Sequence, residues 1–439
     1  MLSVLLSLAL SALSSAIANI ALPSIAHTFA SSDAAAVWVV NGYQVAVLVC
    51  LLPVAALSES LGLKRAYAAG LAIFTLASLG CALSPTLAVL VGARIVQGVG
   101  GAGISVATVA LVRQIYPPHL LGRGFALLAV AVAIPGALGP TIAAMILAVG
   151  NWPWLFLVNV PFGVLAVLVF LAVAPSHVGV ARPFDWTGAL LNALAFGLFI
   201  VGVATLGVGS PRVAAAEMMA GLVCFAVLVM QQLRQRTPLL PLDLLRMPGF
   251  ALSMGASICS YAVQMLAYVS LPFFFETVLH LTPVQTGLLV TPWPFLTAVA
   301  APIAGRLTIR YPASVTSSIG LIVLAAGLLL MAALPAAPAN LDIVWRLAVC
   351  GIGFGLFQTP NNVAMMTAGP VERNGAASGM SAVSRYVGMS LGSALAALIF
   401  GLGGARATIL CLETAAGLAV LGAVASSARR YGRNYKRSE

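Results

Sequence analysis

Residues 35–65 read AAVWVVNGYQVAVLVCLLPVAALSESLGLKR. The first part, residues 35–57, contains no charged residue and is long enough as a helix to cross a hydrocarbon core of about 30 Å, which takes roughly 20 apolar residues. It ends at a polar segment that carries Lys64 and Arg65. A long apolar run followed by a charged loop is typical of a membrane-spanning helix and its connection, and the same pattern recurs along the chain.

The overall composition also indicates an integral membrane protein. Of the 439 residues, 61% are hydrophobic and 7% are charged, whereas soluble domains carry roughly 25% charged residues. The net charge of +11 does not predict a nucleic-acid partner, because Lys and Arg lie singly or in pairs between apolar runs. The six cysteines all lie in apolar segments without metal-ligand spacing, so we expect no metal and no cofactor.

Hydropathy and the positions of Gly, Pro and charged residues predict fourteen spans. They lie near residues 2–25, 35–57, 66–84, 86–112, 124–149, 154–174, 187–208, 215–233, 250–277, 284–305, 313–334, 341–366, 377–401 and 407–427. With the N-terminus inside, sixteen of the 21 Lys and Arg residues fall in loops on the cytoplasmic side and only Arg212 and Arg406 in loops on the other side. This asymmetry predicts that both termini of the multi-pass chain are cytoplasmic. We expect its location to be the bacterial cytoplasmic (inner) membrane.

A weak internal repeat divides the chain. Segments with offsets of 249 to 253 residues match one another: 21–23 with 270–272, 55–57 with 305–307, Arg94 with Arg346, and Gly139 with Gly392. Helices 1 to 6 are therefore expected to correspond to helices 9 to 14, and helices 7 and 8 to form an inserted pair. The predicted parts are a six-helix bundle (1–174), a two-helix insertion (175–249), a second six-helix bundle (250–427) and a basic cytoplasmic tail (428–439).

Four stretches carry a resemblance to a known family. They are 55–65 (AALSESLGLKR), 94–103 (RIVQGVGGAG), 135–144 (PGALGPTIAA) and 151–163 (NWPWLFLVNVPFG). Together they resemble signature segments of the major facilitator superfamily, in particular its fourteen-helix drug:proton antiporter branch, over essentially the whole chain. The resemblance implies an all-α integral membrane fold with two six-helix bundles around a central cavity. It also implies efflux of small amphipathic compounds, of the multidrug resistance type, in exchange for protons.

The resemblance assigns roles to individual residues. Glu59, Gly62, Lys64 and Arg65 take the positions of a gating loop between helices 2 and 3, although a basic loop that only sets topology is the alternative. Arg94 takes the position of an arginine involved in proton coupling, and structural pairing is the alternative. An arginine inside the membrane costs at least about 2.5 to 3.5 kcal/mol, so we expect Arg94 to face the cavity and to find a partner.

The stretch on helix 5 departs in part from the branch pattern. Gly136, Gly139 and Pro140 fit an antiporter signature, but alanines replace its final glycine pair. The resemblance implies that this motif supports exchange of substrate for protons. A proline also bends a helix by removing a backbone hydrogen bond, so a packing kink is the alternative.

Helix 1 lacks the acidic residue that the branch often has, because Ser14 occupies that position. Glu276 on helix 9 is the remaining membrane-embedded candidate for carrying a proton, and a hydrated carboxylate at the interface is the alternative. The repeat pairs it with His27, so the two groups are expected on opposite sides of the outer mouth. Arg346 and Arg385, together with Arg94, would make the cavity positive or neutral and favour neutral or anionic amphipathic compounds over lipophilic cations.

Further polar and aromatic residues within the spans are candidates for lining the cavity, although each is equally explained by a helix–helix contact. They are Asn19, Tyr43, Gln44, Gln97, Trp293, Gln358, Asn361 and Asn362. The expected partners are a small-molecule substrate, protons and the lipid bilayer, with the chain acting as a monomer. The alternatives are a facilitator or exporter of a single neutral or anionic metabolite without proton coupling and, remotely, an intramembrane enzyme. The four histidines lie at span ends or in loops and pair with no nucleophile at close spacing, so we predict that the protein is not an enzyme.

Overall fold

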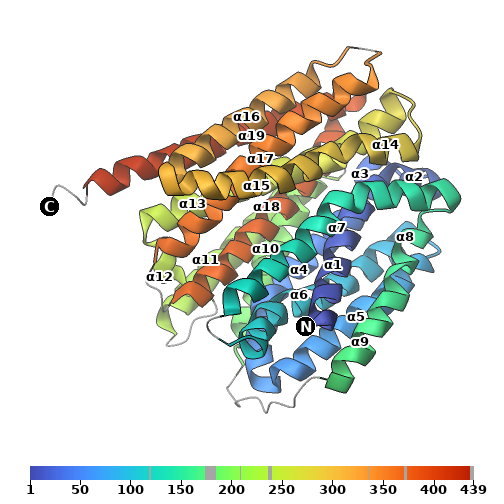
Figure 1. Ribbon diagram of the computed structural model, residues 1–439. Coiled ribbons are helices and arrows are strands. Elements are labelled where there is room, and N and C mark those ends of the chain that lie inside the picture. Colours follow the sequence, from blue (N-terminus) through green and yellow to red (C-terminus); the bar gives the residue numbers. More distant parts are fainter. Residues whose placement is uncertain are drawn as a thin grey trace.

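The chain folds into long helices that lie side by side (Figure 1). The computed structural model describes residues 1–117, 120–173, 184–207, 209–235, 240–335, 337–369 and 373–435, and within these ranges it contains helices and no strand. Fourteen spans in the described ranges are long and apolar enough to cross a membrane. The predicted number of spans is therefore confirmed for this part of the chain.

The spans follow the predicted positions closely. The first six are built from α1 (Leu2–Ile20) with α2 (Leu22–Thr28), α3 (Asp33–Ala36) with α4 (Trp38–Leu61), α5 (Leu63–Ala82), α6 (Leu87–Ile115), α7 (Leu121–Val149), and α8 (Pro153–Leu157) with α9 (Asn159–Val173). The inserted pair is α10 (Trp186–Thr205) and α11 (Pro211–Arg234), and the short α12 (Leu242–Leu245) follows it. The last six are α13 (Pro248–Phe273), α14 (Pro283–Val290) with α15 (Pro292–Arg310), α16 (Ala313–Ala332), α17 (Asn340–Thr367), α18 (Asn374–Leu402) and α19 (Ala407–Tyr435).

Several spans that the sequence predicts as continuous are interrupted close to prolines. The break between α1 and α2 lies at Ala21, two residues before Pro23, and the break between α14 and α15 lies directly before Pro292. Proline lacks the backbone N–H and clashes with the preceding turn, which explains both interruptions. At the end of α13, Pro272 precedes a π-helical segment at Phe274–Val278.

Two six-helix bundles show the same internal packing, as the repeat predicts. In the first bundle α1 packs against α7 and α9, α5 against α6 and α9, and α4 against α6. In the second bundle the corresponding contacts join α13 to α18 and α19, α16 to α17 and α19, and α15 to α17. The bundles meet along two seams, which we name by their main contacts: the α4–α18 seam and the α7–α14 seam.

The inserted pair packs along one seam only. Within the described residues α10 contacts α11, and it also contacts both α4 and α18. The Asn192 side-chain amide donates to the Val49 carbonyl of α4 at 2.9 Å. Asp185 lies just before α10, and its burial tends to raise its pKa. Its carboxylate accepts hydrogen bonds from the backbone N–H of Gly188 and from three glutamine amides of α11 and its C-cap. These hydrogen bonds hold the pKa below its usual value. These contacts attach the pair to the α4–α18 seam.

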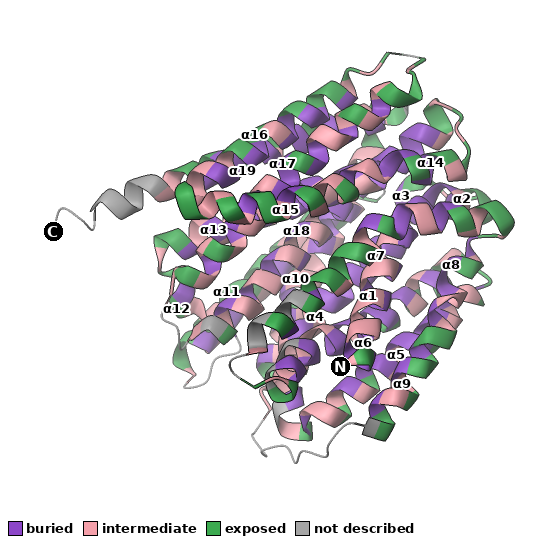
Figure 2. Cartoon of the chain, viewed as in Figure 1, coloured by how far each residue is buried: buried purple, intermediate pink, exposed green. Residues whose placement is uncertain are grey.

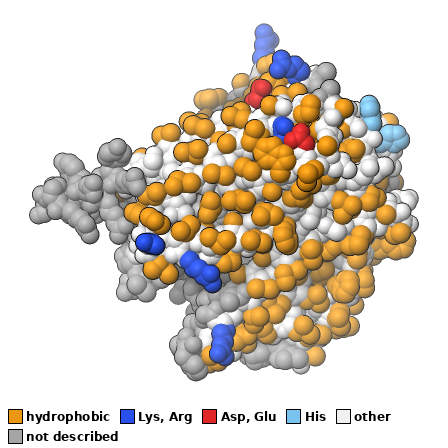
Figure 3. Space-filling model, turned by 45° about the horizontal axis from the view of Figure 1, so that its top comes forward, with side chains coloured by type: hydrophobic (Ala, Val, Ile, Leu, Met, Phe, Trp, Pro, Cys, Tyr) orange, Lys and Arg blue, Asp and Glu red, His pale blue; other side chains and the backbone are white. Residues whose placement is uncertain are grey.

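The outer surface of the helices is apolar. Purple buried positions face neighbouring helices in Figure 2, and the exposed side of α11 carries large hydrophobic residues such as Met219, Leu222 and Phe225. In Figure 3 hydrophobic side chains cover the broad middle of the visible face, and most charged side chains lie nearer its margins. A contiguous apolar belt of this kind is the surface that lipid covers.

The two ends of the molecule differ in charge. One end of the molecule is the end at which α1 begins and α4 and α6 finish, and we call it the basic end. By the alternation of the spans, this end carries Lys64, Arg65, Arg123, Arg234, Arg246, Arg306, Arg310, Arg373 and Arg429 among the described residues. The opposite end carries Arg212 and Arg406 in its connections. Because the number of spans is even, the chain begins and finishes at the basic end.

Glycine pairs allow close helix contacts in both bundles. A Cβ atom on Gly100 of α6 would lie 2.5 Å from the Phe74 backbone nitrogen and 2.7 Å from the Gly70 carbonyl oxygen of α5. In the second bundle, Gly320 of α16 and Gly353 of α17 approach each other in the same way. Small residues at such positions let transmembrane helices pack backbone to backbone.

We expect Gly100→Ala to lower stability, because its methyl group meets backbone atoms that cannot move without separating α5 from α6. The cost of overpacking is about 1–3 kcal/mol. The matched control is Gly92→Ala on the same helix, where an added Cβ has no neighbour within 4 Å. Thermal unfolding of the purified variants in detergent measures both. Equal melting temperatures for the two variants would contradict this account of the α5–α6 contact.

Candidate functional site

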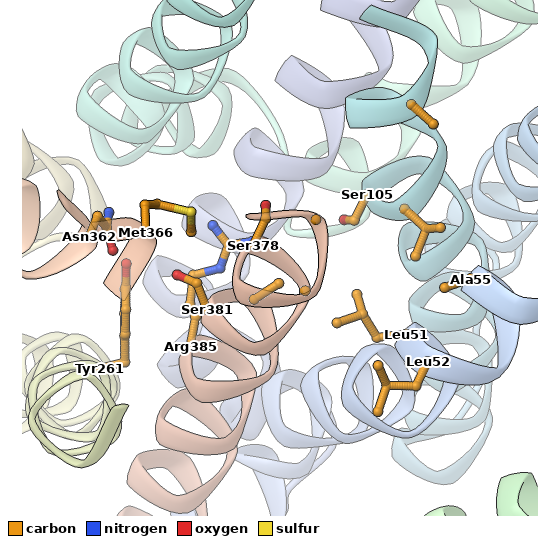
Figure 4. Close-up of a pocket in the computed structure, with 15 residues that line it drawn as sticks. Leu51, Leu52, Ala55, Ser105, Tyr261, Asn362, Met366, Ser378, Ser381 and Arg385 are labelled. Atoms are coloured by element: carbon orange, nitrogen blue, oxygen red, sulfur yellow. The ribbon is translucent and has the colours of Figure 1, made fainter. Parts of the chain in front are cut away.

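A cavity of about 480 Å³ lies between the two bundles. Its lining comes from α4 and α6 of the first bundle and from α13, α17 and α18 of the second (Figure 4). The residues are Leu51, Leu52, Ala55, Ser105, Val106, Ala110, Tyr261, Asn362, Met366, Gly375, Ser378, Gly379, Ser381, Ala382 and Arg385. A cavity of this size is in the range that holds a small organic ligand.

The cavity belongs to the half of the molecule near the basic end. Its residues come from the last part of α4, α6 and α17 and from the first part of α18, all of which adjoin that end. At the opposite end the bundles touch. The hydroxyl groups of Thr141 on α7 and Thr291 beside α14 lie 2.8 Å apart, and Ser393 of α18 donates to the Asn41 side-chain oxygen of α4 at 3.0 Å. The structure therefore has its cavity on the basic side of a closed contact layer.

The helix 5 motif forms part of this layer. A Cβ on Gly139 would lie 2.5 Å from the Ala16 Cβ of α1, so Gly139 permits the close α1–α7 contact. A Cβ atom on Gly287 of α14 would lie 2.5 Å from the Pro140 carbonyl oxygen. A Cβ on Gly136, in contrast, would have no neighbour within 4 Å. Two of the three predicted motif residues are thus at helix contacts, and one of these contacts joins the bundles.

Arg94 is completely buried inside the first bundle. Its Nε donates to the Val39 carbonyl at 2.9 Å, its Nη1 donates to Ser14 Oγ at 3.3 Å and to Gln97, and its guanidinium carbon lies 4.4 Å from the Tyr43 ring centre. Its Nη2 has no hydrogen-bond partner among the described residues. The expectation of a partner is confirmed. The expectation that Arg94 faces the cavity is wrong, because residues of α1, α4 and α8 surround its guanidinium.

Ser14 marks the place where a carboxylate would meet Arg94. The sequence identifies Ser14 as the position that is often acidic in the antiporter branch, and the structure puts its hydroxyl within reach of the guanidinium. Arg94 is held here by carbonyl, hydroxyl and amide oxygens and by aromatic rings. Gln97 continues the network by donating to Ser78 at 2.7 Å.

Arg346 is paired and does not contribute a free charge to the cavity. It lies in the second turn of α17 near the opposite end, and its Nε and Nη2 donate to the two Asp342 carboxylate oxygens at 3.2 Å. It also donates to the Leu330 carbonyl. The prediction that Arg346 makes the cavity positive is therefore wrong, because the acid one turn earlier neutralises it.

Arg385 lies on the cavity surface. It is the one charged residue among those that line the cavity, and within the described part of the chain it forms no ion pair. Figure 4 shows it on α18, between a side with Tyr261 and Asn362 and a side with Leu51 and Leu52. Of the three arginines predicted within spans, this one alone supplies charge to the described cavity.

Glu276 and His27 both lie at the opposite end, one in each bundle. Glu276 belongs to the π-helical segment after α13, is half-buried, and its Oε1 has no hydrogen-bond partner among the described residues. The buried Thr286 lies on the neighbouring α14, and its hydroxyl also has no hydrogen-bond partner among the described residues. His27 near the end of α2 is exposed, and no hydrogen bond or ion pair joins the two in the described ranges.

The predicted gating loop is a sharp junction between α4 and α5. Gly62 separates the two helices with φ 86° and ψ 139°, a conformation that residues with a Cβ rarely adopt. Lys64 and Arg65 lie in the first turn of α5 at the basic end. Glu59 is in the last turn of α4, but its side chain lies outside the described residues.

Most polar residues predicted to line the cavity form contacts between helices instead. Asn362 lines it, and Gln358 orients a lining residue by donating to the Tyr261 hydroxyl at 2.9 Å. The remaining candidates lie outside the described cavity: Asn19, Tyr43, Gln44, Gln97, Trp293 and Asn361. Gln44, for example, donates to the Met265 sulfur across the bundles at 3.5 Å, and Asn361 bonds Ser253 and Arg429 within the second bundle.

The sequence analysis missed the serines of the cavity. Ser378 and Ser381 line it from α18, and Ser105 lines it from α6. A stripe of small and polar residues at 375, 378, 379, 381, 382 and 385 follows helical spacing and was the available signal. Serines are common in membrane helices as packing residues, so this spacing alone does not distinguish a cavity wall from a helix contact.

Two helical bundles that share one packing pattern and enclose a cavity between them define a membrane transporter. The chain belongs to the Major Facilitator Superfamily, whose sequence profile matches residues 4–393 and 252–431. The predicted family and fold are thereby confirmed.

Two relatives and one solved structure illustrate the likeness. The uncharacterized transporter YebQ of Escherichia coli K12 is 45% identical over 98% of this chain and 94% of its own length. The multidrug resistance protein Stp of Mycobacterium tuberculosis CDC 1551 / Oshkosh is 33% identical over 86% of this chain and 71% of its own length. A crystal structure of a POT family transporter in complex with 5-aminolevulinic acid superposes with a TM-score of 0.75 at 13% identity, covering 96% of this chain and 94% of that chain.

The Ser14–Arg94 contact can be tested with a double-mutant cycle. We expect Ser14→Asp to be tolerated when Arg94 is present, because the new carboxylate replaces the hydroxyl that accepts a hydrogen bond from the guanidinium. In an Arg94→Met background the same carboxylate is buried without a counter-charge, and Ser14→Asp should be strongly destabilising. Thermal unfolding of the four proteins should give a favourable coupling free energy of about 0.5–3 kcal/mol. Additive effects would show that the two side chains do not meet.

Proposed function

We propose that this protein exports small amphipathic compounds from the bacterial cytoplasm in exchange for protons, by alternating access across the inner membrane. One observation carries the proposal: the cavity lies between the bundles on one side of a closed contact layer. If the bundles rock against each other, this layer opens and the same cavity reaches the other side. The name of the mycobacterial relative, a multidrug resistance protein, supports export of foreign compounds.

The direction follows from the charge of the two ends. Lys and Arg accumulate in cytoplasmic loops of membrane proteins, so we assign the basic end and both termini to the cytoplasm. The structure then corresponds to the state that loads substrate from inside. One chain contains the whole cavity, which supports a monomer as the working unit. We retain the division into 1–174, 175–249, 250–427 and 428–439 as the proposed domain organisation.

The energy source is the proton gradient. A membrane potential supplies about 2.3 kcal/mol per charge per 100 mV, and each tenfold concentration gradient costs about 1.4 kcal/mol. We assign the proton-carrying group to Glu276, because its carboxylate has an unpartnered oxygen, among the described residues, at the end that would face the outside. π-helical segments are frequent at functional sites, and this one contacts α14 of the α7–α14 seam.

The contact layer can be locked to test alternating access. In a variant without the six native cysteines, Thr141→Cys and Thr291→Cys together should form a disulfide, because their hydroxyl oxygens are 2.8 Å apart. We expect oxidation to reduce transport to background and a reducing agent to restore it. Each single cysteine variant should remain active under oxidation. Full transport by the oxidised double variant would refute the proposed opening between α7 and α14.

Proton coupling can be tested with Glu276→Gln in proteoliposomes, using a panel of cationic, neutral and anionic amphipathic compounds. An imposed pH gradient should accelerate transport several-fold in the unmodified protein and have no effect in the variant, while exchange without a gradient persists. The matched control is Glu413→Gln, an exposed carboxylate in α19 near the same end. If Glu276→Gln still responds to the gradient, the assignment of this residue is wrong. If the unmodified protein transports without any response, the facilitator of a single metabolite is favoured.

A further inference from the structure

The two walls of the cavity differ in character. The wall from the first bundle is formed by Leu51, Leu52, Ala55, Val106 and Ala110, with Ser105 as its single polar side chain. The wall from the second bundle carries the remaining polar groups: Tyr261, Asn362, Ser378, Ser381 and Arg385. In Figure 4 the leucines and the polar groups of α18 lie on different sides. A molecule that fits both walls has an apolar body and a polar head directed toward α18.

The charge of the polar wall is positive and unbalanced. No Asp or Glu lines the described cavity. The described acids lie elsewhere. Asp342 pairs with Arg346, Asp243 pairs with Arg373, and Asp185 caps α10. The other described acids lie toward the opposite end: Asp33, Glu217, Glu276 and Glu413. Among the described residues, a cationic ligand in the cavity would meet an arginine and no carboxylate.

Arg385 is arranged as a ligand-binding residue, in contrast to Arg94. Arg94 is fully buried and held by carbonyl, hydroxyl and amide oxygens of its own bundle. Arg385 is half-buried on the cavity surface, its guanidinium carbon lies 5.2 Å from the Tyr386 ring centre, and it forms no ion pair within the described residues. Ser381 and Ser378 also line the cavity, one and two turns earlier on α18, and add hydroxyl donors beside the guanidinium. A planar guanidinium with adjacent hydroxyls suits a carboxylate, sulfonate or phosphate group.

We propose that the cavity selects amphipathic organic anions, with the anionic head bound by Arg385 and the apolar body against α4 and α6. This inference rests on the proposed function as an exporter and specifies its substrate class. It predicts that charge distinguishes ligands of the same shape. Because hydrogen bonds to a charged group are stronger than neutral ones, an anion should bind about tenfold or more tightly than its neutral analogue.

Three probes of one shape test the charge preference: 2-naphthoate, 2-naphthamide and 2-naphthylmethylammonium. Binding is measured by calorimetric titration of the full-length protein in nanodiscs of neutral lipid, with empty nanodiscs as the reference for partitioning into lipid. We expect naphthoate to bind about tenfold or more tightly than naphthamide, and the ammonium compound to bind most weakly. Equal affinities, or a preference for the ammonium compound, would overturn the inference.

Two variants assign the preference to the cavity. Arg385→Gln should remove the preference for naphthoate and leave naphthamide binding unchanged. Ser381→Asp places a carboxylate one turn before Arg385 and should likewise remove the preference for naphthoate, while improving the binding of the ammonium compound. The control is Arg310→Gln, which removes an exposed positive charge at the end of α15, outside the cavity, and should leave all three affinities unchanged. A naphthoate preference that survives both cavity variants would also overturn the inference.

Binding and transport separate this inference from the proposed function. If gradient-driven export favours the ammonium compound, the protein is an exporter and the anion inference is wrong. If naphthoate binds through Arg385 but no probe crosses the membrane, the substrate site is supported and the proposed export fails. Melting temperatures of Arg385→Gln and Ser381→Asp close to that of the unmodified protein would show that altered binding does not result from unfolding.

Discussion

The exclusion of water from the bilayer core is the constraint on which the rest of this structure depends. Without water, each backbone amide must find its partner inside the protein, so the described chain crosses the apolar belt as helices. The same exclusion makes a lone charge costly, and Arg94 is therefore surrounded by a backbone carbonyl, a serine, a glutamine and two aromatic rings. The cavity is the place where a guanidinium without a described ion-pair partner, that of Arg385, is tolerated.

The sequence was sufficient to predict the fold, because apolar length and the distribution of basic residues are determined by the membrane and need no tertiary information. The spans, their order and the repeat all follow from such local signals. The prolines at 23 and 292 were visible as well, but only the structure shows that they divide a span into two helices. A break of this kind depends on what packs beside it.

The site was predicted less completely, because hydropathy does not reveal which face of a helix points toward a cavity. Tyr43 and Asn362 are both polar residues in apolar runs. The Tyr43 ring lies against the Arg94 guanidinium, whereas Asn362 lines the cavity. The pairing of Arg346 with Asp342 was within reach, since the two residues are one helical turn apart. The burial of Arg94 could not be predicted from the sequence, because it depends on how α4 and α6 pack against each other.

The inserted helices make the two seams between the bundles unequal, although duplication alone would make them alike. If the two bundles were joined by two similar seams, they could tilt apart equally well at either seam. Here α10 contacts both sides of the α4–α18 seam, whereas within the described residues the α7–α14 seam has no such cover. Relative movement at the covered seam must slide two surfaces past a third helix. If the bundles rock as proposed, the α7–α14 seam separates by breaking direct contacts alone, and the covered α4–α18 seam acts as the pivot.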